Sequence, residues 1–560
     1  MDQLVAQLGV LMGLVLLLAF LFRKLRLSLI LSYIAAGVLA HLVFARAGAK
    51  LDHALEHTLP ELGIMLLLFC AGMEIEFAHV RKRLGSILVI AGSQMAGTLL
   101  LGFGIACLVL DVGSVATAVY VGLCLTFSST VIVVQWLNER RQLDSLHGMI
   151  LLGLLVLQDI AAVLSLAVLE SLVGGSLGAG LFAVLVKLVV IATVLFLIGR
   201  YVLTWLFDRC AASAELFFVA TFAWCFGVAG LCHLIHFSAE LAAFLAGVAL
   251  ANLRHYKLEI SDKVEPLRDL GLILFFTSLG MGLKFSNQIL EYSVGIGLML
   301  LVVWFGTMLL MGFAARSRGL RKRTVFMVAL LPTQISEFSL VLATLCLKAG
   351  VFDAAVFGVV TWAAIFSIFA FSLGSSHLER LYERFGVFMN WLERGAKDRV
   401  EGLDEQALAD HTIVMGFNPI GRAVVNALLA RGEKVVLVDL DPDVHAEAQG
   451  LMAEHKERLG FIFGDMGDPD VWVEAGMRKA RLIVSCLQGG QTDELGILEW
   501  KRKHNAGARS VVVAETPEHA AALREGGADY VLVPEHLAAA EIETLFSASD
   551  FPENLIAQTE

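Results

Sequence analysis

The sequence predicts a polytopic α-helical membrane protein that carries a soluble α/β domain at its C-terminal end. Hydrophobic residues make up 58% of the 560 residues and charged residues only 17%, whereas soluble domains are about half apolar and a quarter charged. The charge is also unevenly distributed. Residues 1–378 contain 24 Lys and Arg against 21 Asp and Glu, a balance of +3, and the remaining residues carry −14. A very apolar body therefore precedes an acidic, polar segment, which excludes a single soluble globule and a disordered chain.

The apolar body, 1–378, is the predicted transmembrane domain. A helix needs about 20 apolar residues to cross a bilayer. About thirteen stretches come near this length, of which 238–252 and 266–282 are the shortest. The stretches are 5–22, 28–45, 58–75, 87–110, 115–137, 147–170, 179–207, 214–234, 238–252, 266–282, 290–314, 324–348 and 353–377.

Basic residues sort to alternate loops between these stretches. One set of loops contains 17 Lys and Arg and the other contains four. Because basic residues gather on the cytosolic side of a membrane, this asymmetry predicts an N-terminus outside and a cytosolic C-terminal domain. The eight cysteines lack CxxC spacing, so we expect neither a disulfide framework nor a metal site.

Asp159 lies near the centre of the stretch 147–170, where no basic residue compensates it. A charge at the bilayer midplane is costly and commonly marks an ion or proton path. The alternative is a buried Asp that only caps or pairs with another helix.

Two other spans look interrupted at the same depth. Pro332 lies in the polar run 331–338, and Ser and Thr residues fill 126–130. Proline breaks a helix, and transporters place paired broken helices around an ion site. Helix packing is the alternative for the Ser/Thr run. Glu337 either neutralises a helix end, which we prefer, or binds cation. The candidate ion and proton site comprises Thr126, Ser128, Ser129, Thr130, Gln158, Asp159, Gln334, Ser336 and Glu337.

From His411 onward the pattern becomes α/β. Short apolar strands are predicted at 412–415, 434–438, 461–463, 482–485, 510–514 and 530–533. The turn 416–421 leads from the first strand into a helix, and the second strand ends at Asp439. Strand, glycine turn, helix, strand and acid form the βαβ unit of a Rossmann domain.

The body resembles the monovalent cation:proton antiporter-2 family, specifically the Kef-type potassium/proton antiporters. The resemblance rests on the order and spacing of several segments rather than on one motif. They are FCAGME (69–74), SSTVIVVQWLNER (128–140), LQDIAA (157–162), AFLAGV (243–248), FFTSLGM (275–281) and QISEF (334–338).

This resemblance implies an antiporter fold in a bacterial-type inner membrane, with crossed discontinuous helices at 115–137 and 324–348. It implies that Asp159 carries the ion and the proton, and that a core moves like an elevator against a dimerisation domain of a homodimer. Gln158 stands where sodium-selective relatives often have a second acid, which favours K⁺ over Na⁺. The stretch 290–314 lacks the basic residue of many relatives, which favours electroneutral exchange.

Residues 411–535 resemble the RCK (TrkA-N or KTN) domain, which a charged linker at 379–410 precedes and a tail at 536–560 follows. The resemblance implies an adenine nucleotide, AMP or NAD(H), at Gly416, Phe417, Asn418, Ile420, Gly421, Asp439 and Asp465. Asn418 replaces the middle glycine of the phosphate-binding turn, Pro419 removes an N–H donor, and Glu515 adds negative charge. A dimeric scaffold without ligand therefore stays an alternative, and we expect no enzymatic activity and no nucleic-acid partner.

A predicted cytosolic loop at 254–269 carries Glu259, Asp262 and Glu265. In Kef-type relatives the corresponding loop relays the state of the soluble domain to the transporter. The alternative is a solvated loop without this role.

Three functions compete on the sequence alone. A secondary antiporter fits Asp159 and the interrupted spans. An RCK-gated potassium channel would need a filter such as TVGYG, and no such run occurs in the sequence. A membrane scaffold with a dead transport core would not need Asp159 or the region around Pro332.

Overall fold

The computed structural model describes residues 2–543 with gaps. The gaps are 26, 48–51, 53–57, 75–83, 141, 144, 174–178, 211–212, 235–236, 252–256, 284–291, 376, 386–402, 404–407, 440–441, 488–493, 515, 535, 537 and 540–542. The chain forms two compact units. The first comprises Met1–Val133, Ile150–Arg318 and Val325–Phe388, and the second comprises Val134–Met149, Gly319–Thr324 and Met389–Glu560.

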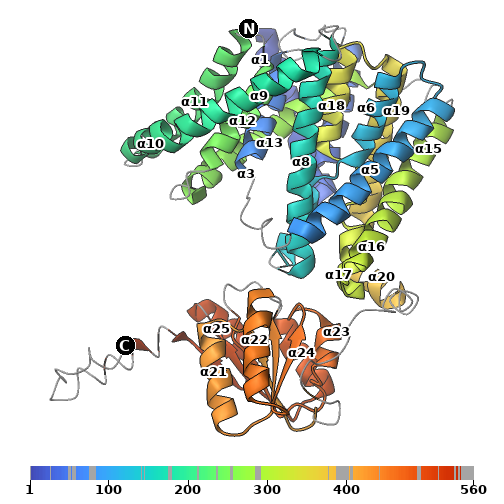
Figure 1. The fold of residues 1–560 in the computed structure, drawn as a ribbon. Helices are drawn as coiled ribbons and strands as arrows, with labels where there is room; N and C mark the ends of the chain where they lie inside the picture. The colour runs from blue at the N-terminus through green and yellow to red at the C-terminus, as the bar shows by residue number, and fades with distance from the viewer. Residues whose placement is uncertain are drawn as a thin grey trace. The chain divides into compact units, whose positions relative to one another are not determined.

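Helices occupy the apolar body (Figure 1). In chain order they are α1 (Asp2–Lys24), α2 (Leu29–Arg46), α3 (Leu59–Glu74), α5 (Leu84–Leu108), α6 (Val115–Thr126), α7 (Thr130–Glu139), α8 (Leu146–Val173), α9 (Ala179–Ile198), π-helical η2 (Gly199–Leu203), α10 (Thr204–Cys210), α11 (Ala214–Leu234), α12 (Ala239–Ala251), α13 (Lys257–Gly282), α15 (Ser293–Leu301), π-helical η4 (Val302–Gly306), α16 (Thr307–Ser317), α17 (Lys322–Leu330), α18 (Glu337–Lys348), α19 (Ala354–Ser375) and α20 (Leu378–Phe385).

Helices fall on every one of the predicted apolar stretches. Among the described residues, nine helical segments are long and apolar enough to cross a membrane, and α3 and α12 are shorter apolar helices. The total of thirteen spans stays a prediction. The two predicted interruptions are confirmed, because α6 and α7 are separate helices and so are α17 and α18.

Helix α13 begins earlier than its predicted span. The prediction started at Pro266 and treated 254–269 as a loop, but the backbone is helical from Lys257. Hydropathy marks only the part of a helix that lies in the hydrocarbon core of the bilayer, and the helix itself can extend beyond it. Glu259, Asp262 and Glu265 are therefore helical. Their side chains lie outside the described residues, and their regulatory role stays a prediction.

Two pairs of helices cross at glycines. In the first pair, α3 and α12, a Cβ added to Gly247 would lie 2.0 Å from the carbonyl oxygen of Phe69. A Cβ added to Gly72 would lie 2.2 Å from the carbonyl oxygen of Phe244. Each helix thus contributes a glycine that meets the backbone of its partner, as small residues allow in membrane helix packing.

The second pair, α2 and α13, repeats this arrangement. A Cβ on Gly37 would lie 2.0 Å from the carbonyl oxygen of Thr277, and one on Gly280 would lie 2.1 Å from that of Ile34. We call α2, α3, α12 and α13 the glycine-crossed bundle. Three of the segments that carry the family resemblance lie in this bundle, namely 69–74, 243–248 and 275–281.

The second unit contains a six-stranded parallel sheet in the order β3-β2-β1-β4-β5-β6. Its strands are β1 (Thr412–Met415), β2 (Val435–Asp439), β3 (Leu459–Phe463), β4 (Leu482–Ser485), β5 (Arg509–Val513) and β6 (Tyr530–Leu532). The predicted strands are each confirmed within two residues. This strand order is that of the Rossmann fold.

Helices cover both faces of this sheet (Figure 1). One face packs against α21 (Pro419–Ala430) and α22 (Pro442–Glu454), and the other against α23 (Pro469–Glu474) and α24 (Glu494–His504). Helix α25 (Pro517–Glu525) packs beside β5 and β6. In such sheets, ligands bind at the carboxyl edge where the strand order reverses, which here is between β1 and β4.

Candidate functional site

The first broken helix is interrupted for three residues. Helix α6 ends at Thr126 and α7 begins at Thr130, and Phe127 adopts an extended conformation. Thr126, Ser128 and Ser129 are all buried. Because unwound backbone in a membrane needs internal hydrogen-bond partners, the partners of this segment define the architecture of the site.

The second broken helix is interrupted around Pro332. Helix α17 ends at Leu330, and α18 begins at Glu337 with Ser336 as its N-cap. The hydroxyl of Ser336 accepts a hydrogen bond from the backbone N–H of Phe338. The backbone N–H of Ile335 donates to the hydroxyl of Ser367 on α19 at 3.0 Å. The hydroxyls of Ser336 and Ser367 therefore each pair one backbone donor at this break.

The two breaks bond directly to each other. The backbone N–H of Ser336 donates to the carbonyl of Phe127 at 2.9 Å, and the hydroxyl of Ser128 donates to the carbonyl of Pro332 at 2.7 Å. The side-chain amide of Gln334 reaches the carbonyl of Ser129 at 3.5 Å. Segments about 200 residues apart in sequence thus complete each other's backbone hydrogen bonds.

Asp159 lies in α8 beside the first break and is 9% exposed. Thr130, the first residue of α7, places its hydroxyl 3.3 Å from one oxygen of the Asp159 carboxylate and 3.5 Å from the other. The break and the carboxylate predicted to carry the ion are thus neighbours in space.

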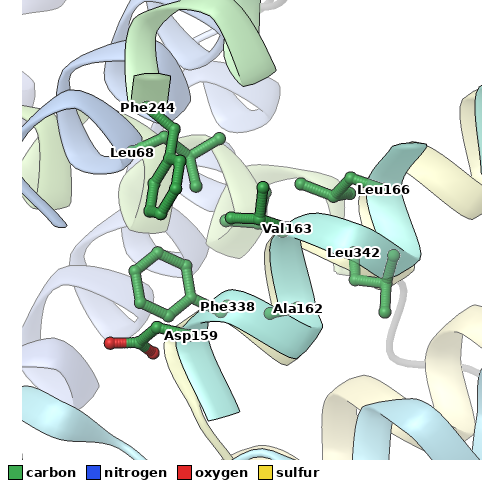
Figure 2. Close-up of a pocket in the computed structure, with 9 residues that line it drawn as sticks. Leu68, Asp159, Ala162, Val163, Leu166, Phe244, Phe338 and Leu342 are labelled. Atoms are coloured by element: carbon green, nitrogen blue, oxygen red, sulfur yellow. The ribbon is translucent and has the colours of Figure 1, made fainter. Parts of the chain in front are cut away.

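Apolar side chains and Asp159 together line a small cavity (Figure 2). This cavity of about 10 Å³ next to the carboxylate has room for about one water molecule. Leu68 and Phe244 line it from the glycine-crossed bundle, and Val163 and Phe338 line it from α8 and α18. Asp159 therefore lies between a polar break and an apolar seal.

The remaining predicted residues occupy different positions around the two breaks. Gln158 is fully buried, and its side-chain oxygen accepts a hydrogen bond from the backbone N–H of Ser128 at 2.9 Å. Among the described residues, the Oε1 atom of buried Gln334 has no hydrogen-bond partner. Glu337 is buried in the first turn of α18, where a carboxylate is favoured by the helix dipole. Their roles as ion ligands stay predictions.

Sequence reasoning did not single out Gln94 on α5. This residue is 1% exposed and bonds to both Gln158 and the end of α6. The available signal was an amide side chain inside the apolar stretch 87–110. Its partners lie 32 and 64 residues away in the sequence, so nothing local indicated its role.

In the Rossmann domain, the predicted nucleotide site is built around Gly416. The φ of Gly416, +91°, suits glycine. A Cβ added to Gly421 would lie 1.9 Å from the carbonyl oxygen of Gly416, so this position also requires glycine. Asp439 accepts a hydrogen bond from the backbone N–H of Phe417 at 2.8 Å. Ile420 lies in the first turn of α21 and packs on the sheet.

Asn418 occupies the place where a phosphate would meet the helix. Its side-chain oxygen accepts a hydrogen bond from the backbone N–H of Gly421 at 2.9 Å, and its side-chain amide donates to the carbonyl of Cys486 after β4. The side chain thus caps α21 and bridges the ends of β1 and β4, where a ligand would bind.

Two other residues, Asp465 and Glu515, were predicted to affect this nucleotide site. Asp465 is buried and accepts a hydrogen bond from the backbone N–H of Gly467 at 2.9 Å, so one of its oxygens holds its own loop. Glu515 lies outside the described residues.

In the described part of the chain, no group of three or more His, Cys, Asp or Glu side chains is arranged to hold a metal ion. The described cysteines are free thiols.

Comparison with known proteins agrees with this architecture. Residues 11–377 match the family described as sodium/hydrogen exchanger, transmembrane, and residues 412–534 match the TrkA-N domain. The chain therefore belongs to the sodium/hydrogen exchanger family and carries a TrkA-N domain, as its resemblance to cation:proton antiporters with an RCK domain predicted.

Individual relatives are similar over most of the chain. A putative K(+) efflux antiporter KefB from Alkalimonas amylolytica is 28% identical, covering 96% of this chain and 80% of the relative. The putative cation/proton antiporter YbaL from Escherichia coli K12 is 29% identical, covering 93% and 94%. The glutathione-regulated potassium-efflux system protein KefC from Shigella flexneri is 28% identical, covering 90% and 79%. The protein is thus a membrane protein of the cation/proton antiporter class.

Proposed function

We propose that this protein exchanges K⁺ for H⁺ across the membrane, with the Asp159 carboxylate binding each in turn. The supporting observation is the position of Asp159, buried beside the hydroxyl of Thr130 and next to two broken helices that bond to each other. A cation bound there would use the carboxylate and the Thr130 hydroxyl. The Oε1 atom of Gln334, which has no hydrogen-bond partner in the described part of the chain, is a further oxygen of the kind that such ions prefer.

Coupled exchange follows from competition for one carboxylate. If Asp159 binds either a proton or a cation, and the empty, charged site crosses the membrane poorly, each crossing must carry one or the other. Loading a proton on one side and a cation on the other then gives antiport. One charge for one charge makes the exchange electroneutral.

Alternating access is proposed to occur by an elevator-like movement. The seal on Asp159 is formed by side chains from two sets of helices, the glycine-crossed bundle and the broken-helix core of α8 and α18. Sliding of the core along the bundle would separate Phe338 from Leu68 and Phe244 and admit water to the carboxylate. We further propose a homodimer with the N-terminus outside and the Rossmann domain in the cytosol, as the loop charges predict.

Potassium is preferred over sodium on two grounds. Gln158 is neutral where a second acid would favour Na⁺, and two of the relatives named above are described as K⁺ or potassium efflux proteins. Sodium/proton exchange is the alternative. The test is a proteoliposome assay in which an outward K⁺ or Na⁺ gradient is imposed and the internal pH is followed with a dye.

The expected result of that assay is acidification driven by K⁺ more strongly than by Na⁺, without current. A preference for Na⁺ would reject the proposed substrate but keep the antiporter. Current without coupled proton movement would indicate a channel, and neither current nor pH change would indicate a scaffold.

We propose that the TrkA-N domain regulates exchange and that Asn418 weakens its nucleotide site. Replacing Asn418 with glycine is expected to raise the affinity for AMP about tenfold, because it frees the Gly421 N–H as one more phosphate donor. Titration calorimetry of the full chain in detergent measures this. Asn418→Asp is the matched control, because it keeps the helix cap, adds negative charge and should not gain affinity. Equal, measurable AMP affinities in Asn418→Gly and the wild type would reject the role of Asn418, and no AMP binding by either protein would favour the ligand-free scaffold.

A further inference from the structure

We propose that Gln94 is a positioning residue of the transport site, which fixes the broken ends of α6 and α7 relative to Asp159 through Gln158. The inference rests on the proposed function, since it concerns how well the site around Asp159 binds its cation. Gln94 lies on α5, outside both broken helices and outside α8.

The contacts of Gln94 place it at the end of α6. Its side-chain amide nitrogen donates to the carbonyl of Thr126 at 2.9 Å and reaches the hydroxyl of Thr98 at 3.3 Å. Thr126 is the last residue of α6, and a carbonyl at a helix end has no partner within its own helix. Gln94 therefore supplies a donor, the nearer of two, to this buried carbonyl.

Gln94 also orients the neighbouring amide of Gln158. The side-chain nitrogen of Gln158 donates to the Oε1 atom of Gln94 at 2.8 Å and reaches the Thr126 carbonyl at 3.2 Å. The side-chain oxygen of Gln158 accepts from the N–H of Ser128. Both amide nitrogens thus use their two donors, and Gln158 connects the two sides of the break.

The directions of these bonds fix how the Gln158 amide is turned. A flipped Gln158 would face the Ser128 N–H with its own NH₂ group and would face two acceptors, Gln94 Oε1 and the Thr126 carbonyl, with its oxygen. Both contacts would be repulsive in a buried site. Because Gln94 presents an acceptor to Gln158, it helps to select the orientation in which Gln158 receives the Ser128 N–H.

This network determines where Thr130 lies. Only Phe127, Ser128 and Ser129 separate the end of α6 from Thr130, and Gln94 and Gln158 hold the backbone on both sides of Phe127. Gln158 precedes Asp159 in the same helix. The distance from the Thr130 hydroxyl to the Asp159 carboxylate, 3.3 Å, is therefore set by a frame that includes Gln94.

The role can be tested with Gln94→Leu, which is similar in size and removes the amide. In this variant Gln158 loses the acceptor Gln94 Oε1, and the Thr126 carbonyl loses the donor Gln94 Nε2. Gln158 and the end of α6 can then shift, and the Thr130 hydroxyl is no longer well placed to bind the cation. We expect the apparent KM for K⁺ to rise about tenfold and the pH dependence of exchange to shift, with the maximal rate reduced much less. Proteoliposome exchange at several K⁺ concentrations and pH values measures both.

The matched control is Thr98→Val, which removes only the 3.3 Å bond to Gln94 and leaves the bonds to Thr126 and Gln158. It should keep a wild-type KM. If Gln94 were only structural, Gln94→Leu would lower the amount of folded protein or the maximal rate at an unchanged KM and pH profile, which would overturn the inference.

Two further results are distinguishable. If Gln94→Leu does not fold, Gln94→Asn, whose amide is one methylene too short to reach Thr126, must show the same rise in KM, and a wild-type KM there rejects the inference. If wild-type protein shows no exchange at all, the proposed function fails and this inference fails with it.

Discussion

Replacing Asp159 with asparagine is expected to reduce cation-driven proton movement to the level of empty liposomes. Asparagine has the same shape but neither releases a proton nor offers a negative charge to a cation, so both half-reactions are lost. The protein should still fold, because the side-chain oxygen of asparagine can accept the hydrogen bond that Thr130 gives to Asp159. The measurement is internal pH in proteoliposomes under a K⁺ or Na⁺ gradient.

The matched control for this variant is Asp111→Asn, which neutralises an exposed aspartate in the same unit. The backbone of Asp111 has a positive φ of 49°, which asparagine adopts readily, so its transport rate should match the wild type. Both variants should elute as the wild type does in size-exclusion chromatography. Robust exchange by Asp159→Asn would show that another group, with Glu337 the first candidate, carries the proton.

The main features of the transport core were predictable because their signals are local. A proline and a run of hydroxyl side chains inside apolar stretches are conspicuous, and α6–α7 and α17–α18 are broken at these places. A single acid in an apolar helix is equally conspicuous. Pattern alone thus located Pro332, Thr126–Thr130 and Asp159.

What pattern could not supply is which distant groups pair. The bond between Ser336 and Phe127 and the amide pair of Gln94 and Gln158 depend on how helices pack in three dimensions. Gln158 illustrates the consequence. Its residue type and its place beside Asp159 suggested an ion ligand, yet its side chain is engaged with Gln94 and the backbone of the break.

In the Rossmann domain the sequence identified Asn418 as a departure from the glycine pattern but not the contacts of its side chain. Asn418 replaces the middle glycine of the phosphate-binding turn, and its effect on nucleotide binding stays a prediction. The structure shows that this side chain caps α21 and bonds to the carbonyl of Cys486. A cap can be recognised from residue type, but a bond across the sheet to β4 requires the fold.

Gly72 and Gly247, which lie in two of the segments that resemble the antiporter family, let α3 and α12 cross closely. The sequence did not reveal this role. Gly247→Ala is expected to destabilise the protein strongly. The new methyl group would lie 2.0 Å from the Phe69 carbonyl oxygen, so α3 and α12 would have to move apart. Overpacking by one carbon typically costs about 1–3 kcal/mol, and this contact is with backbone, which cannot rotate away. Gly247→Val should prevent folding altogether.

Thermal unfolding of the detergent-solubilised protein measures the effect, and α11 offers the control. Gly227 lies in that helix with nothing within 4 Å of an added Cβ, so Gly227→Ala should be neutral or stabilising by up to about 1 kcal/mol. Gly72→Ala should resemble Gly247→Ala, because its methyl group would lie 2.2 Å from the Phe244 carbonyl oxygen. The two alanine variants test one crossing from both sides. Equal unfolding temperatures for Gly247→Ala and Gly227→Ala would contradict a close crossing of α3 and α12, and with it a rigid bundle against which the core could slide.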